Sequence, residues 1–135
     1  MSARPLVLDL LPGSFAVSRL DPGAAVPGWA DRPGSPLSSR TRTADELSVV
    51  CPADLVPEGV RAERGWRAFR VEGPLPFALT GVLASIAGPL ADAGVNLFVV
   101  STFDTDYVLV PGRLLDRAAA ALEAEGHAVR RPAGS

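Results

Sequence analysis

Residues 73–111, GPLPFALTGVLASIAGPLADAGVNLFVVSTFDTDYVLVP, constrain the fold of this chain more than any other segment. After a glycine-proline turn, apolar side chains recur at helical spacing and form a single stripe: Leu79, Val82, Leu83, Ile86 and Leu90. This pattern predicts an amphipathic helix with one buried face, ending at Gly94. Because Pro89 lies inside it and lacks a backbone N–H, we expect a kink or an early loosening there.

Two apolar, strand-like segments follow, and a polar turn at Asp104 and Thr105 separates them. A turn this short joins antiparallel neighbours, so the pattern predicts a hairpin. A second helix is predicted with a stripe of Leu115, Ala118, Ala119 and Leu122. The full predicted order is strand 66–71, the first helix, strand 96–103, strand 107–110, helix 113–125 and strand 127–131, which is the βαββαβ order of a ferredoxin-like unit.

The first half of the chain repeats this order in a degraded form. Residues 6–11 and 14–20 are strand-like and flank Pro12-Gly13, which predicts a hairpin between them. The remaining predicted elements are a short helix at 24–30, a hairpin of 37–43 with 46–51, a helical turn at 53–58 and a strand at 60–63. We therefore predict an α+β fold of two ferredoxin-like βαββαβ units, the first with shortened helices: residues 1–64, residues 65–131 and a tail at 132–135.

Composition excludes several classes of function. The net charge is −2, so nothing indicates a nucleic-acid surface. All 13 basic residues are arginine. No apolar run approaches the ~20 residues that cross a membrane. The first residues are more typical of a strand and turn than of a signal peptide, so we expect a cytoplasmic protein without a membrane partner.

No catalytic constellation is evident, and no cofactor is predicted. Cys51 is the only cysteine and is interpreted as a small buried core residue. His127 is the only histidine, and its place after a glycine helix stop is interpreted as solvent-facing. Asp104 and Asp106 lie two residues apart and are interpreted mainly as turn formers, with Asp106 as a candidate single ligand carboxylate. A small enzyme is therefore the least favoured of the functions considered.

The segment that leads into the first predicted helix is a candidate small-molecule site. The free N–H groups and the positive dipole end of a helix start can hold a carboxylate. Because Pro74 and Pro76 have no N–H, the donors would be those of Leu75, Phe77 and Ala78. A free α-amino acid, whose carboxylate and ammonium groups lie close together, matches such a site. The alternative is a helix start in a purely structural domain.

Three segments together resemble a known family. STFDTDYVLVP at 101–111 is the most specific of them, and DELSVVCP at 45–52 and LPGSFAVSRLDP at 11–22 fit the same pattern. They are similar to the ACT domains of small tandem-ACT proteins, which are related to the regulatory domains of aspartate kinase and to the arginine sensor CASTOR. The resemblance implies βαββαβ units that bind an amino acid at the seam between two ACT repeats.

The resemblance also implies a set of ligand-binding residues: Ser48, Val49, Gly73, Leu75, Thr102, Phe103 and Asp106. Asp106 would meet the side chain of a basic ligand, and the shortened first helix makes a second, equivalent site doubtful. The implied function is a regulatory sensor whose partner is a free amino acid, basic ones included, and side-by-side association as a homodimer is compatible with it. The alternative is a ligand-free interaction module or accessory subunit of the same fold.

Overall fold

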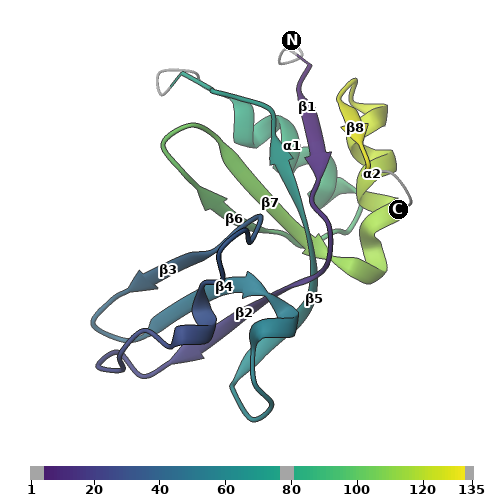
Figure 1. The fold of residues 1–135 in the computed structure, drawn as a ribbon. Helices are drawn as coiled ribbons and strands as arrows, with labels where there is room; N and C mark the ends of the chain where they lie inside the picture. The colour runs from purple at the N-terminus through teal and green to yellow at the C-terminus, as the bar shows by residue number, and fades with distance from the viewer. Residues whose placement is uncertain (1–4, 77–80, 133–135) are drawn as a thin grey trace. The chain divides into compact units, whose positions relative to one another are not determined.

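A computed structural model of the chain describes residues 5–76 and 81–132. By their contacts these residues form two compact units, which Figure 1 shows as ribbons: unit 2, made of Gly13–Trp66, and unit 1, made of Met1–Pro12 together with Arg67–Ser135. Unit 2 is thus inserted between the first residues of unit 1 and the rest of it. The boundary predicted at 64/65 lies close to the second junction, but residues 5–12 pack with unit 1.

Unit 2 is a mixed unit with an antiparallel sheet and two short 3₁₀ turns. Strand β2 (Phe15–Leu20) pairs with β4 (Leu47–Pro52) and with the first part of β5 (Ala62–Val71), and β4 pairs with β3 (Ser39–Arg42). The 3₁₀ turns η1 (Gly28–Ala30) and η2 (Ala53–Leu55) stand where a ferredoxin-like unit has its helices. The predicted shortening of the helices is confirmed, as is the β3–β4 hairpin.

A small apolar core holds unit 2 together. Cys51 is fully buried in it, with Ala16, Leu47 and Val49, as the sequence predicted. Burial raises the pKa of the Cys51 thiol, and Asp54 adds to that shift. The thiol is therefore neutral and unreactive near pH 7.

The described part of unit 1 contains two α-helices and five strand segments. Strand β7 (Asp106–Pro111) pairs with β5 and with β6 (Phe98–Ser101), while β1 (Val7–Leu10) lies between β5 and the last strand, β8 (Ala128–Arg130). β1 runs antiparallel to β5 and parallel to β8. In an ordinary ferredoxin-like unit the last strand pairs with the first. Here these two strands are β8 and β5, and the chain's N-terminal strand, β1, is inserted between them.

The predicted hairpin between β1 and β2 is wrong. β1 pairs with residues 69–71 of β5, and β2 pairs with residues 62–66 of the same strand, both antiparallel. Two segments that are each antiparallel to β5 run in the same direction and cannot form a hairpin with each other. Pro12 and Gly13, with Gly13 at φ 75°, therefore mark the passage from one unit to the other.

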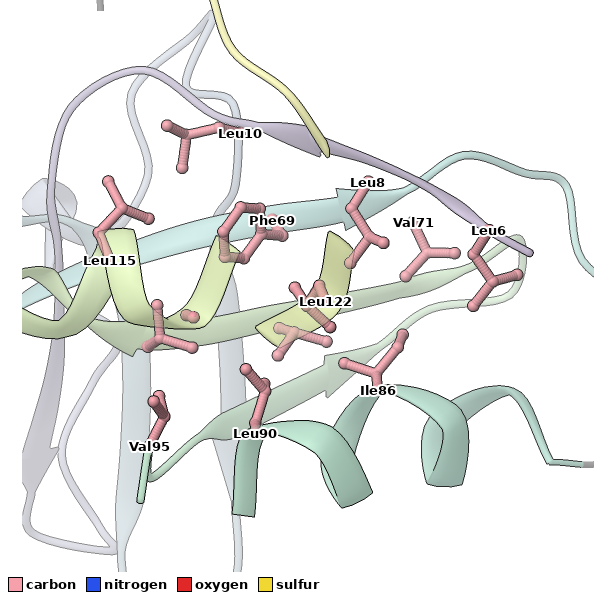
Figure 2. Close-up of a cluster of buried hydrophobic side chains, with 13 residues drawn as sticks. Leu6, Leu8, Leu10, Phe69, Val71, Ile86, Leu90, Val95, Leu115 and Leu122 are labelled. Carbon is pink, nitrogen blue, oxygen red and sulfur yellow. The ribbon is translucent and has the colours of Figure 1, made fainter. Parts of the chain in front are cut away.

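The helices of unit 1 cover its apolar core. Helix α1 (Val82–Asp92) buries Ile86 and Leu90, and α2 (Leu115–Ala124), preceded by the 3₁₀ turn η3 (Gly112–Leu114), buries its predicted stripe. Figure 2 shows Ile86 and Leu90 of α1 and Leu115 and Leu122 of α2 together with Leu8 and Phe69 from the strands. Leu83 is 40% exposed, so the predicted stripe of α1 is narrower than expected. Leu79 lies outside the described residues.

His127 is buried and not solvent-facing, contrary to the sequence interpretation. Its Nδ1 accepts a hydrogen bond from Leu6 N–H at 3.0 Å, and its Nε2 lies 3.0 Å from the Ser85 carbonyl oxygen. With Nδ1 as an acceptor, the proton of the neutral ring is on Nε2 and is donated to Ser85. Ser85 is the residue whose carbonyl would accept the missing N–H of Pro89. The histidine therefore satisfies the carbonyl that Pro89 leaves free, and α1 continues through Pro89 to Asp92.

Replacing His127 with alanine is expected to lower the free energy of unfolding by about 3 kcal/mol. Two backbone groups would lose a partner, and each loss costs about 1–3 kcal/mol when the group is buried. Urea denaturation measures the change. The control is Pro89→Ala, which restores an N–H to Ser85 and should recover more stability in the His127→Ala background than in the wild-type protein. Equal effects of Pro89→Ala in both backgrounds would contradict the assigned pairing.

Asp9 of β1 lies in an ion cluster with arginines of the neighbouring strands. Its carboxylate accepts two hydrogen bonds from Arg130, at 2.6 and 2.9 Å, and Arg70 lies 4.0 Å away. Arg130 also binds Glu72. Hydrogen bonding from Arg130 lowers the pKa of Asp9, and partial burial of the carboxyl group opposes this shift. The positive charges of Arg130 and Arg70 also lower the pKa.

A lowered pKa in the folded state means that Asp9 stabilises the fold above its unfolded pKa of about 3.9. This stabilisation is lost as the pH falls through the lower, folded pKa. The difference in unfolding free energy between wild type and Asp9→Asn should therefore be constant near neutral pH and shrink below about pH 4. Chemical denaturation at a series of pH values measures it. A difference that grows on acidification would contradict the assignment.

Among the described residues, no helix is long and apolar enough to cross a membrane.

Candidate functional site

The hairpin of β6 and β7 carries a polar tip. The last paired residues are Ser101 and Asp106, so the loop between the strands has four residues, 102–105, and is longer than the predicted turn of Asp104 and Thr105. Thr102 N–H donates to the Thr105 carbonyl at 2.8 Å, and the Thr105 N–H reaches the Thr102 hydroxyl at 3.3 Å. These bonds close the loop and fix the direction of its side chains.

A cavity of about 190 Å³ lies between this hairpin tip and the start of α1. Its lining comes from the tip, from the segment that follows β5 and from the first residue of α1: Leu75, Pro76, Val82, Ser101, Thr102, Phe103, Asp104, Thr105 and Asp106. We call it the unit 1 cavity. Four of the seven predicted ligand residues line it, namely Leu75, Thr102, Phe103 and Asp106.

Close backbone packing fixes one wall of the unit 1 cavity. The Thr105 hydroxyl is buried and donates to the Val71 carbonyl of β5 at 2.6 Å, while Leu75 N–H donates to the Asp104 carbonyl at 2.7 Å. A side chain at Gly73 would place its Cβ 3.1 Å from the Asp104 carbonyl oxygen and 3.2 Å from Thr105 Cβ. Gly73 is another of the seven predicted ligand residues. Because it has no side chain, the segment that follows β5 can approach the hairpin tip.

Leu75 N–H was predicted to donate a hydrogen bond to a ligand carboxylate. This prediction is corrected, because Leu75 N–H already donates to the Asp104 carbonyl. Phe77 and Ala78 lie outside the described residues. The helix starts later than predicted, with Gly81 at φ 80° as its N-cap, so Gly81 is not inside the helix. The first N–H groups of a helix have no intrahelical acceptor. Because Val82 begins α1 and lines the cavity, this helix start is the donor group that the described structure offers.

The charge of the unit 1 cavity is negative. Its described lining contains the carboxylates of Asp104 and Asp106 and no basic side chain. Asp106 accepts a hydrogen bond from the Ser101 hydroxyl at 2.6 Å, which orients its carboxylate, and it is half-buried, whereas Asp104 is exposed. A cavity with this lining favours an ammonium or guanidinium group over an anion near Asp106.

Ser48 and Val49, the other two predicted residues, belong to strand β4 of unit 2. Val49 is fully buried in the unit 2 core, and Ser48 is half-buried and lines a different cavity. Their ligand role, like the seam between repeats, stays a prediction. Sequence reasoning missed Ser101 and Thr105 of the unit 1 cavity. The signal was available, because the run 101–106 offers a hydroxyl or a carboxylate at five of its six positions.

The residues that the structure describes include no group of three or more histidine, cysteine, aspartate or glutamate side chains placed to hold a metal ion.

Two family models each match one part of the chain. A family model described as "ACT domain" matches residues 61–124, and a second model, described only as an N-terminal domain, matches residues 13–59. The cytosolic arginine sensor for mTORC1 subunit 1 of Rattus norvegicus is 44% identical over 116 residues, which are 79% of this chain and 35% of the relative. Its Homo sapiens counterpart is 44% identical over 67 residues, 49% of this chain and 20% of the relative. The chain thus spans about a third or less of these relatives.

Solved structures share the fold of this chain. A crystal structure of a protein from Agrobacterium tumefaciens aligns with a TM-score of 0.90 at 42% identity and covers 96% of each chain. The regulatory subunit of aspartate kinase from Thermus thermophilus aligns with a TM-score of 0.58 at 12% identity, covering 87% of this chain and 95% of the subunit. At that identity the second likeness shows the fold alone.

Proposed function

Because this chain belongs to the ACT-domain family, we propose that it is a non-catalytic regulatory protein that binds a free amino acid in the unit 1 cavity. The observation that carries the proposal is that the lining of one cavity contains two groups of opposite electrostatic character. Val82 brings the positive end of α1, and Asp106 brings an oriented carboxylate. An α-amino acid carries groups complementary to both.

A basic amino acid fits this cavity better than a neutral one. The α-carboxylate would meet the start of α1, and a cationic side chain would meet Asp106, in a lining that has two carboxylates and no described basic group. The similarity to an arginine sensor supports the same ligand class. An amino acid of about ten heavy atoms can reach micromolar affinity at about 0.8 kcal/mol per atom, within the range for small ligands.

A second candidate function, a protein–protein interaction module, is favoured by one observation. Phe103 at the hairpin tip is 79% exposed, and the neighbouring strand β6 is an apolar edge strand that pairs only with β7 among the described strands. Apolar edge strands are sites where other chains can associate. Association of two copies as a homodimer would use such an edge, and it is compatible with ligand binding as well as with a ligand-free accessory subunit.

A thermal-denaturation screen against the twenty proteinogenic amino acids separates the two functions. A ligand present at about 100 times its dissociation constant adds about 2.7 kcal/mol to the free energy of unfolding, which is several degrees in melting temperature. We expect arginine or lysine to give the largest increase. If no amino acid raises the melting temperature at 10 mM, a concentration about 10,000 times a micromolar dissociation constant, the interaction module becomes the better description.

A further inference from the structure

The sheet of unit 2 places two arginines directly across from each other. Arg19 of β2 pairs with Ser48 of β4, and the Arg19 N–H donates to the Arg61 carbonyl at 2.9 Å. Arg61, Arg19 and Ser48 therefore form one row across three chain segments. Val17 and Glu63 pair in the next row, two residues along each strand, so their side chains lie on the same face as this row.

The charges in these rows have no ion-pair partner among the residues that the structure describes. Like charges directly across a sheet repel each other unless an opposite charge lies between them. Arg19 donates to the Asp45 backbone carbonyl, but neither Arg19 nor Arg61 lies within 4.0 Å of a carboxylate in the described part of the chain. Glu46 and Glu63 likewise have no arginine within that distance there.

These same side chains line a cavity of about 230 Å³ that is separate from the unit 1 cavity and shares no residue with it. Its polar lining consists of Arg19, Arg61, Ser18, Ser48, Glu46 and Glu63. The arginines and Ser48 are donors, and the two glutamates are acceptors on the same rim. An anion alone would be attracted by the arginines but repelled by the glutamates.

We propose that this cavity, which we call the unit 2 cavity, is a second binding site, for a small zwitterion. The ligand's carboxylate lies between Arg19 and Arg61 and accepts from Ser48, and its ammonium group donates to Glu63 and Glu46. Charge-assisted hydrogen bonds of this kind relieve the repulsion between the arginines and use every charged group of the lining. The lining is neutral overall, with two positive and two negative charges, and therefore selects a ligand that carries both signs.

The test compares three chemically related probes in amide chemical-shift titrations of the full chain. L-alanine carries both charges, propionate lacks the ammonium group and ethylamine lacks the carboxylate. We expect L-alanine to give saturable shifts at residues 17–19, 46–48 and 61–63, with propionate at least five-fold weaker and ethylamine inactive there. Propionate binding as tightly as L-alanine would overturn the assignment, because it would indicate a simple anion site. The absence of saturable shifts up to 50 mM L-alanine would overturn it entirely.

Variants then locate the binding and separate it from the unit 1 cavity. Arg61→Gln should weaken L-alanine binding at these amides at least ten-fold, and Glu63→Gln should weaken L-alanine while strengthening propionate. Arg40→Gln is the matched control, because Arg40 is an exposed arginine of β3 that does not line the cavity. Asp106→Asn should leave the unit 2 titration unchanged. Equal losses in Arg61→Gln and Arg40→Gln, or loss of the unit 2 shifts in Asp106→Asn, would contradict the proposal.

Discussion

A chain that begins at Gly13 is expected to lose the folded structure of unit 1 and to keep that of unit 2. The missing segment contains β1, which supplies the only strand partner of β8 among the described strands and one partner of β5. Leu6, Leu8 and Leu10 on this segment are each at most 6% exposed and belong to the unit 1 core. Unit 2 retains its own strands and its own apolar cluster.

The size of the effect follows from the burial of those three leucines. Each fully buried leucine contributes about 1.5–3 kcal/mol through removal of apolar surface from water, so their sum is roughly 5–9 kcal/mol. Domains of this size have a total stability of about 5–15 kcal/mol. The loss therefore takes most or all of the stability of unit 1, and the His127 bond to the Leu6 N–H disappears with it.

Amide exchange and two-dimensional NMR of the truncated chain measure the outcome unit by unit. A chain that begins at residue 5 is the matched control and should have the spectrum of the full chain. Native-like shifts for α1, α2 and β7 in the chain that begins at Gly13 would contradict the placement of β1. Such a result would instead favour the sequence-based domain boundary, under which residues 65–131 form a complete repeat.

Replacing Asp106 with asparagine is expected to weaken binding of a basic amino acid by about 10- to 100-fold. A hydrogen bond to a charged group contributes about 1.5–3 kcal/mol, and the substitution removes the charge while leaving an oxygen that accepts from Ser101. Stability should change by no more than about 0.5 kcal/mol, because the side chain is half-buried at the end of strand β7 and keeps its hydrogen bond. Isothermal titration calorimetry with L-arginine measures the affinity.

Asp104→Asn is the matched control for this substitution. It removes the same charge from the same cavity rim, but Asp104 is exposed and holds the loop through its backbone carbonyl, which the substitution keeps. We expect a loss of less than five-fold. Equal losses in the two variants would indicate a diffuse effect of negative charge and would contradict a direct contact with Asp106.

The elements of unit 1 were largely predictable from local patterns. The stripe of α2 is buried as predicted, and the β6–β7 hairpin forms near its expected limits, because spacing and turn residues act over a few positions along the chain. The pairing of β1 was not predictable in this way. Its partners are about 60 residues away at β5 and about 120 residues away at β8, and Pro12-Gly13 gives the same local signal for a hairpin and for a change of unit.

The environment of His127 shows the same limit. A histidine after a glycine helix stop is usually solvated, and only the approach of Leu6 and Ser85, 121 and 42 positions away, buries it. More of the lining of the unit 1 cavity was predictable than the environment of His127. The predicted order of hairpin and helix already brings residues 101–106 close to Gly73. The hydrogen bond from Leu75 N–H to the Asp104 carbonyl was not predictable from the sequence. This bond removes Leu75 N–H from the expected donors to a ligand carboxylate and leaves the N–H groups at the start of α1.

Binding of a free amino acid in the unit 1 cavity is tested most directly by an amide chemical-shift titration of the full chain with L-arginine. We predict saturable shifts concentrated at residues 73–76, 82–84 and 101–106, which surround the cavity. These shifts should be absent or require at least ten-fold more ligand in Asp106→Asn. Saturable shifts located only elsewhere in the chain, or none with any of the twenty amino acids, would contradict the proposed function.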